Sequence, residues 1–158
     1  MKKNLGLLIF FFSLTAFAVT KENGPDEFAK NFYQQYLNFI HSLKGSSTPQ
    51  KHFQSIKKQI GHSVSKNYWE KYVRRYKHCG KLKEPTDECD RDNIYCAQEA
   101  PTDFKIQNLM STSKKEASLD VNLCFNCGQT SNEYHRIAHV QLSVDTKNSW
   151  KIESINCQ

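Results

Sequence analysis

Residues 117–125 read Ala-Ser-Leu-Asp-Val-Asn-Leu-Cys-Phe, and this stretch decides the fold. Every second position is apolar, from Ala117 through Val121 to Phe125. Alternation with a period of two predicts a strand that buries one of its faces. The pattern recurs over residues 138–144 and again from residue 150, and a further strand is expected over residues 104–111. The C-terminal third is therefore predicted to form a four-stranded antiparallel meander, and the preceding residues must cover its apolar face.

The first eighteen residues have the composition of a secretory signal peptide. Lys2 and Lys3 are followed by an apolar run over residues 5–17, and Ala16-Phe17-Ala18 is a small-x-small cleavage site. This apolar run is shorter than the roughly 20 residues of a membrane-spanning helix. The sequence thus predicts a signal peptide over 1–18, no transmembrane segment in the mature form, and a single domain over 19–158 that is periplasmic or secreted.

The charge balance is basic. The full chain carries a formal charge of +6, and removal of Lys2 and Lys3 leaves 20 basic and 16 acidic residues, a net charge of +4. An exported protein rarely meets nucleic acid, so nucleic acid is not expected as a partner. Anionic cell-wall polymers, lipid headgroups and an acidic protein are the partners that this charge favours.

Six cysteines in an exported chain favour disulfides over free thiols, because the compartment is oxidising. Strand polarity in an up-and-down meander places the start of the first strand and the ends of the second and fourth strands at one end of the sheet. We therefore expect the cysteines to gather at that end and to be fully paired. Cys124 pairs with Cys127 in one arrangement, and one of the two reaches Cys96 or Cys157 in others. The six residues are Cys79, Cys89, Cys96, Cys124, Cys127 and Cys157.

Three helices are predicted before the sheet. The first begins at Pro25, carries aromatic residues at spacings of three and four from Phe28 to Phe39, and is expected to end at Gly45. The second runs from Pro49 to Ile60, and the third begins after Ser65 or Asn67. With the meander, these elements give the α+β class, with N-terminal helices packed on a curved four-stranded antiparallel sheet.

The third helix is expected to end in a cluster of cations. Cations at a helix C-terminus interact favourably with the helix dipole, which explains the cluster without a ligand. The alternative is a patch that docks an anion. Its candidate residues are Arg74, Arg75, Lys77 and Lys81.

Residues 79–101 lack a sustained period and contain three cysteines and five acidic residues before Ala97. An irregular segment of this length is uncommon in a compact domain unless it is functional or covalently stapled. The three cysteines offer such a staple.

Two chemistries of Cys124-Phe-Asn-Cys127 were weighed against a structural disulfide. A redox pair needs a helix N-terminus to lower the thiol pKa, whereas this pair leaves a strand and enters a polar loop. A zinc site would also need His135 and His139, which are roughly 13 Å apart on a strand that rises about 3.3 Å per residue. Neither a metal nor a cofactor is therefore predicted.

Candidate polar residues for a pocket are Asp120, His135 and His139. No nucleophile elbow, zinc-protease motif or phosphate-binding glycine loop is present. No catalytic residue is therefore predicted, and both histidines are expected on the face opposite Val140 and Leu142.

Several residues carry a resemblance to a known fold. They are Phe28, Phe32-Tyr33 and Tyr36-Leu37 in the first helix, Asp92 and Gln98 before the first strand, and residues 150–153 at the start of the last. The chain resembles the nuclear transport factor 2-like (cystatin-like) cone and, more narrowly, a family of uncharacterised secreted bacterial proteins on that fold. The resemblance covers most of the chain after residue 18. It implies a curved sheet around the first helix and a conical pocket, used for binding in many members and for isomerase or dehydratase chemistry in some.

These observations favour an exported, non-enzymatic small binding protein with a protein partner or a small ligand in the periplasm. A specific form is an immunity-type inhibitor of a cell-wall-degrading effector. The rival hypothesis is a pocket enzyme of the isomerase, dehydratase or hydrolase type on the same cone, with Asp120, His135 or His139 as acid or base. The two hypotheses differ in whether those three side chains face the pocket or the solvent.

Overall fold

The structure is a computed structural model of the 158-residue chain, and it describes residues 24–43, 49–82, 86, 89, 91–129 and 132–158. The predicted signal peptide over residues 1–18 lies outside the described residues. Within these described residues, three helices are followed by four strands. This order confirms the α+β class.

The first helix, α1, spans Pro25–Ser42. Gly24 is its N-cap, proline occupies the first helical position, and Asp26 and Glu27 face the positive end of the helix dipole. The helix ends three residues before the predicted Gly45, where the Leu43 N–H donates to the Ile40 carbonyl at 3.0 Å. Its buried residues are Ala29, Phe32, Tyr33, Tyr36 and Leu37.

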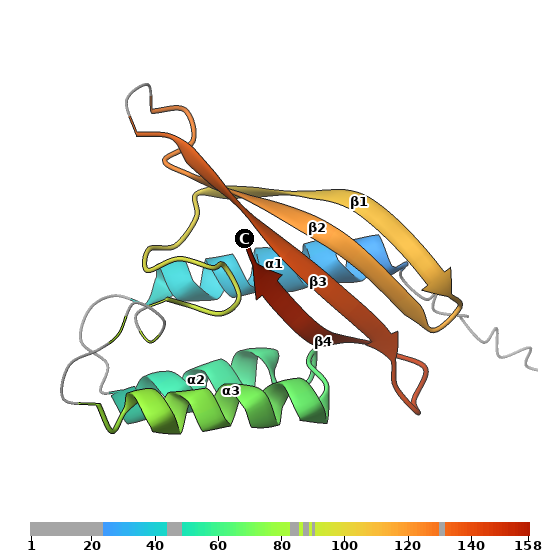
Figure 1. Ribbon diagram of the computed structural model, residues 1–158, viewed down its shortest axis with the longest axis horizontal. Helices are drawn as coiled ribbons and strands as arrows, with labels where there is room; N and C mark the ends of the chain where they lie inside the picture. The colour runs from blue at the N-terminus through green and yellow to red at the C-terminus, as the bar shows by residue number, and fades with distance from the viewer. Residues whose placement is uncertain (1–23, 44–48, 83–85, 87–88, 90, 130–131) are drawn as a thin grey trace, which may run out of the picture.

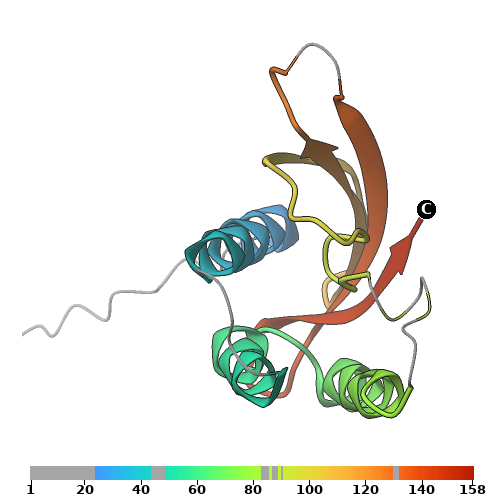
Figure 2. The same cartoon turned by 90° about the vertical axis from the view of Figure 1, so that its left-hand side faces the viewer.

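The second and third helices, α2 (Pro49–Ile60) and α3 (Lys66–Cys79), lie side by side below the sheet (Figures 1 and 2). Ser65 is the N-cap of α3, because its hydroxyl accepts from the Tyr68 N–H at 3.1 Å. This hydrogen bond decides between the two caps that the sequence allows.

The sheet contains β1 (Asp103–Ser113), β2 (Glu116–Phe125), β3 (Tyr134–Val144) and β4 (Trp150–Cys157). Its strand order is β1-β2-β3-β4, and all three pairings are antiparallel. The predicted meander is therefore confirmed, with strand ends shifted by a few residues. Figure 1 shows the strands descending in this order, with β4 at the edge nearest α2 and α3.

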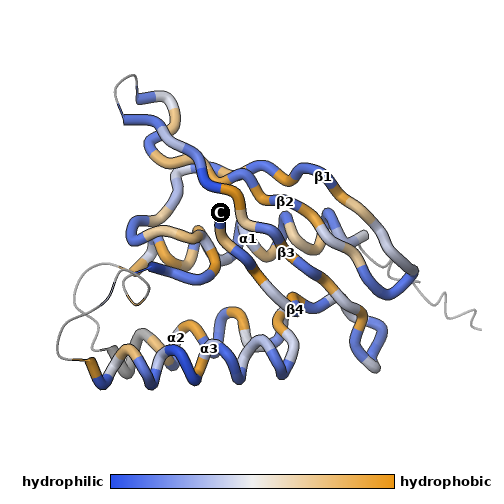
Figure 3. Tube along the Cα trace, in the orientation of Figure 1, coloured by the Kyte–Doolittle hydropathy of each residue, from blue (hydrophilic) through white to orange (hydrophobic). Residues whose placement is uncertain are grey.

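The two faces of the sheet differ in burial. The inner face, which is the face with buried side chains, packs against α1 on the concave side of the sheet (Figure 2). The outer face carries the alternate residues, and hydrophilic and hydrophobic positions alternate along β2 and β3 (Figure 3). The inner-face core includes Leu119, Val121, Leu123, Ala138, Val140, Leu142 and Ile152.

All six cysteines are paired in three disulfides. Cys79 bonds Cys89, Cys96 bonds Cys157, and Cys124 bonds Cys127. The C-terminus of α3, the end of β4 and the β2–β3 connection point to the same side of the molecule (Figure 1). Full pairing agrees with the predicted oxidising, non-cytoplasmic compartment. In the described part of the chain, no helix combines the length and apolarity needed to cross a membrane.

Candidate functional site

Residues 92–97, in the irregular segment before the sheet, are organised by Asp92. Its carboxylate accepts the Tyr36 hydroxyl at 2.6 Å and the backbone N–H groups of Ile94 and Tyr95 at 2.7 and 3.2 Å. Its backbone closes a turn with Ala97 and Cys96 at 2.8 and 2.9 Å. Asp92 as a residue is half-buried, but its carboxylate points inward to α1. Residues 92–97 thus have a fixed conformation although their sequence has no period.

Burial and tyrosine neighbours set the electrostatics around this carboxylate. Loss of hydration raises the Asp92 pKa. The donors of Tyr36, Ile94 and Tyr95, and then the positive charge of Arg75, oppose that rise only in part. Burial is the larger cause that raises the pKa of nearby tyrosines, and the negative charge of Asp92 is the second. These tyrosines therefore remain neutral hydrogen-bond donors. The affected tyrosines are Tyr33, Tyr36, Tyr68, Tyr72 and Tyr95.

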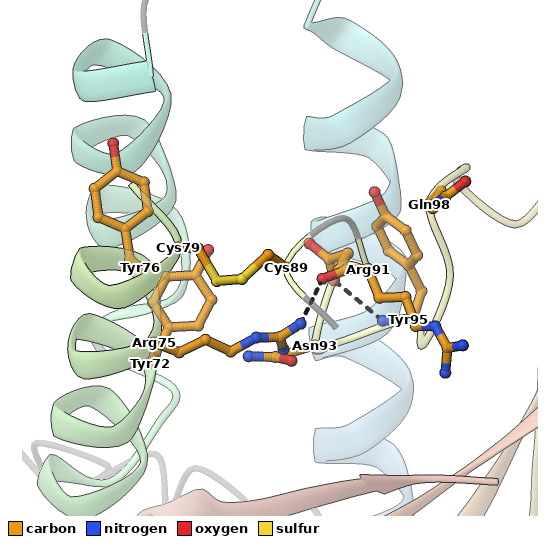
Figure 4. Close-up of a pocket in the computed structure, with 10 residues that line it drawn as sticks. Tyr72, Arg75, Tyr76, Cys79, Cys89, Arg91, Asn93, Tyr95 and Gln98 are labelled. Carbon is orange, nitrogen blue, oxygen red and sulfur yellow. Dashed lines mark hydrogen bonds between the residues drawn. A yellow bond between two sulfur atoms is a disulfide. The ribbon is translucent and has the colours of Figure 1, made fainter. Parts of the chain in front are cut away.

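A hollow of about 240 Å³ opens between α3 on one side and Cys89 with residues 91–98 on the other (Figure 4). Tyr72, Arg75 and Tyr76 project from α3, and the opposite wall carries Arg91, Asn93, Tyr95 and Gln98. The Arg75 guanidinium crosses the hollow and donates to the Arg91 carbonyl at 3.0 Å. The Cys79–Cys89 disulfide closes one end and covalently joins the two walls.

A second hollow of about 250 Å³ adjoins the first and shares Tyr72, Arg75 and Asn93 with it. It lies between α3 and residues 153–156 of β4, and it is also lined by Tyr68 and Lys71. We call the two hollows together the α3 groove. The groove extends along α3 from Tyr68 to Cys79. Because an α-helix rises about 1.5 Å per residue, this length is roughly 16 Å.

The acidic and basic side chains that line the α3 groove differ in their contacts. Asp92 is held by three donors, and Glu153 accepts the Ser143 hydroxyl. By contrast, none of the ion pairs among the described residues includes Lys71, Arg75 or Arg91. The groove therefore presents cations that have no carboxylate at ion-pair distance, between aromatic and amide side chains, an arrangement suited to an anionic or polar ligand.

A third hollow, of about 560 Å³, continues from the groove through Arg91 and Gln98 to Tyr134 and Arg136. The Arg136 Nε atom is buried and has no hydrogen-bond partner in the described part of the chain. Glu99 at this hollow already accepts the Tyr134 hydroxyl at 2.6 Å. The excess of unpaired cations thus extends beyond α3 itself.

The predicted anion patch is divided by the helix surface. Arg75 turns into the α3 groove, whereas the side chains of Arg74, Lys77 and Lys81 are exposed and line none of the three hollows. Arg91, which belongs to the irregular segment, lies opposite Arg75 in the groove. The sequence prediction therefore identified one of the two arginines that the fold brings together.

Asp120 and His139 meet across β2 and β3, where they are paired in register on the outer face. His139 Nδ1 is in hydrogen-bond contact with Asp120 Oδ1, and Asn108 Nδ2 donates to Asp120 Oδ2 at 2.8 Å. The Asn108 and His139 contacts lower the Asp120 pKa, and contacts with Gln158 and Asp120 raise the His139 pKa. The pair faces solvent, away from the α3 groove.

His135 also lies on the outer face, as predicted from the alternation in β3. Its Nδ1 is 3.0 Å from Asn122 Oδ1, and its Nε2 is 3.2 Å from Glu133 Oε1. Cys124, Glu133 and His135 form one group with the spacing of metal ligands in the described residues. Because Cys124 is bonded to Cys127, it offers no thiolate, and His139 is engaged elsewhere by Asp120.

The sequence prediction missed Arg91, Asn93 and Tyr95 as groove residues. Asp92 was named only as one of the residues that carry the resemblance, and its organising role was not predicted. A local signal does exist, because an aspartate often accepts from backbone N–H groups two and three residues ahead. The contacts of Asp92 with Tyr36 and of Arg75 with Arg91 leave no such signal in the sequence.

No protein-family model matches this chain, and no match was found among the curated proteins or among the solved structures.

Proposed function

We propose that this protein is an exported, non-enzymatic binding protein whose α3 groove holds an anionic group of its partner. The observation that supports the proposal is the pair Arg75 and Arg91, which line one hollow and have no carboxylate in ion-pair contact. A guanidinium group presents a planar fork of donors that suits carboxylate or phosphate.

The shape of the groove supports binding by a preformed surface. The Cys79–Cys89 disulfide joins its two walls, and Asp92 fixes the segment that carries Arg91. Groups held in place before binding lose little conformational entropy when a ligand arrives. Tyr72 and Tyr76 add rigid aromatic area of the kind that dominates many binding surfaces.

The enzyme hypothesis depended on Asp120, His135 and His139 in a pocket. All three are on the outer face of the sheet, and none lines the α3 groove. The Asp120–His139 pair has the contact of an oriented base, but among the described residues its hydrogen bonds do not include a serine, threonine or cysteine nucleophile. We therefore propose binding and assign these residues no catalytic role.

The proposal also covers the fold family and the cellular compartment. The curved sheet around α1 supports a nuclear transport factor 2-like cone, and the three disulfides support the periplasm or the extracellular space. In its most specific form, the protein is an immunity-type inhibitor that blocks a cell-wall-degrading effector in the periplasm.

The proposal is tested by affinity capture from the native periplasm with three forms of the mature protein. These are the wild type, the double variant Arg75→Gln/Arg91→Gln, and the matched control Arg74→Gln/Lys77→Gln. Both double variants remove two positive charges, but only the first removes charges from the groove. Native mass spectrometry of the eluate distinguishes a protein partner from a small molecule.

We expect the groove variant to retain at least tenfold less partner than the wild type, and the control to retain a wild-type amount. Equal losses in both variants would show that general basicity, and not the groove, holds the partner. For the immunity form, the captured protein should degrade peptidoglycan, and a stoichiometric amount of the wild type should stop it.

A further inference from the structure

The two edges of the sheet are protected to different degrees. The β1 edge is interrupted by two register irregularities, and Asn108, which lies within the first of them, has a positive φ of 49°. Such bulges twist an edge strand and discourage the addition of another chain. The register of β4 is shifted only once, near Gln141 and Leu142 of its partner, and runs regularly from Ser154 to Cys157.

The first half of the β4 edge already accepts a short piece of added strand. Residues 63–65 run parallel to it, with a bridge between Val64 and Ile152. The Ile152 N–H donates to the Ser63 carbonyl at 3.0 Å, and the Ser65 N–H donates to the Ile152 carbonyl at 2.9 Å. The chain then enters α3 at Lys66 and leaves the edge. The edge is therefore competent for pairing, but its covering ends after three residues.

The second half of the edge has backbone groups that point outward. The Gln158 N–H donates to Ile137 on β3, so the pair formed by residues 158 and 137 is hydrogen-bonded. In an antiparallel ladder such pairs alternate with non-hydrogen-bonded ones, whose N–H and C=O groups face away from the partner strand. Ile155, opposite Val140, is in a non-hydrogen-bonded pair, as is Cys157 opposite Ala138. In the described part of the chain, no hydrogen bond engages the outward groups of these two residues.

This open edge borders the second hollow of the α3 groove. Residues 153–156 line one side, and Tyr68, Lys71 and Arg75 line the other. Tyr68 is only 7% exposed, and its buried hydroxyl has no hydrogen-bond partner in the described part of the chain. An extended peptide would satisfy the backbone groups of β4, and its acidic side chains would meet Lys71 and Arg75.

We propose that the partner contributes an extended acidic segment that adds to the edge of β4 at residues 154–157 and continues the line of residues 63–65. This inference rests on the proposed function, because it specifies how the partner of the α3 groove is held. Backbone hydrogen bonds supply the alignment, and the two cations select acidic side chains.

The test uses a defined probe, the fluorescein-labelled peptide Ser-Glu-Val-Glu-Val-Glu-Ser, and measures its binding by fluorescence polarisation. A second peptide has the same sequence with alternate amide nitrogens methylated, which keeps the charge and removes the strand donors. A third has lysine in place of glutamate. On the protein side, the only backbone hydrogen-bonding group that Ile155→Pro removes is an outward N–H. Ile155→Ala is its control, because it also loses the isoleucine packing but keeps that N–H.

We expect the glutamate peptide to bind the wild type and Ile155→Ala, and the N-methylated peptide and Ile155→Pro to weaken binding at least tenfold. We also expect amide hydrogen exchange at Ile155 and Cys157 to slow when the glutamate peptide is bound. The lysine peptide should not bind. If Ile155→Pro fails to fold, the N-methylated peptide still decides the result.

The outcomes separate this inference from the proposed function. If methylation leaves binding unchanged while Arg75→Gln/Arg91→Gln abolishes it, strand addition is wrong and the anion-binding groove stands. If the lysine peptide binds as well as the glutamate peptide, the charge selection is wrong. If no peptide binds the wild type, the strand-addition inference is wrong, and the capture experiment decides the groove separately.

Discussion

The outer face of the sheet and the α3 groove differ in whether their basic side chains contact a carboxylate. On the outer face, His139 meets Asp120 and His135 meets Glu133, so each histidine has a carboxylate in contact. In the groove, the carboxylate of Asp92 is satisfied by a tyrosine and two backbone amides, while Arg75 and Arg91 have no carboxylate in ion-pair contact.

The difference has a structural origin. The outer-face partners come from neighbouring strand positions or from two residues away in sequence, so local geometry brings them together. The groove residues come from a helix, an irregular segment and an edge strand, and only the tertiary fold places them around one hollow. Cations that have no carboxylate at ion-pair distance can form such a contact with a partner, and this distinguishes the groove from the outer face.

The largest expected effect separates the inner and outer faces by burial. Phe32 is 5% exposed between α1 and the sheet, so Phe32→Ala should lower the free energy of unfolding by about 3–5 kcal/mol through the cavity that it leaves. Ile137 is 37% exposed on the outer face, and Ile137→Ala should cost less than about 1 kcal/mol. Denaturant unfolding measures both. A loss below about 1 kcal/mol for Phe32→Ala would contradict its place in the core.

An intermediate effect is expected at Asp92. Asp92→Ala leaves the Tyr36 hydroxyl and two backbone N–H groups without an acceptor, and should lower the free energy of unfolding by about 2–4 kcal/mol. Asp92→Asn keeps an acceptor oxygen and should lose less. If the alanine and asparagine variants were equally stable, the hydrogen bonds would not organise the segment.

The difference in stability between the wild type and Asp92→Asn should also depend on pH, with a definite sign. Burial raises the folded-state pKa of Asp92 above its ordinary 3.8, so the folded protein binds this proton more tightly than the unfolded chain. The stability that protonation contributes is fully present below pH 3.8 and is lost as pH rises through the raised pKa. The wild-type stability minus that of Asp92→Asn should therefore fall over this window.

The smallest effect is expected on the outer face. Asp120→Asn removes the carboxylate beside His139 and should lower the raised His139 pKa toward its ordinary 6.5, as followed by NMR titration of the imidazole ring. The stability due to His139 is present below pH 6.5 and lost as pH rises through its raised pKa. That due to Asp120 is present above pH 3.8 and lost as pH falls through its lowered pKa. An unchanged His139 pKa in Asp120→Asn would mean that Gln158 alone maintains it.

Much of the fold could be predicted because its signals are periodic. Alternation over residues 117–125 identified both the strand and its buried face, and the same rule placed His135 and His139 on the outer face. The site was predicted poorly. Basic residues near the end of α3 were visible, but a helix distributes them around its surface, and only Arg75 faces the groove.

By itself, the sequence determined the α+β class, the three helices, the meander and the expectation that every cysteine is oxidised. These features depend on side-chain periodicity, caps and cysteine count, all of which are local or compositional. The tertiary structure alone decided that Cys96 bonds Cys157 across 61 residues, that Asp92 docks on Tyr36, and that Arg91 lies opposite Arg75. Contacts of this kind depend on how an aperiodic segment closes against distant elements. The described residues of this segment are held by hydrogen bonds and disulfides whose partners lie on α1, α3 and β4.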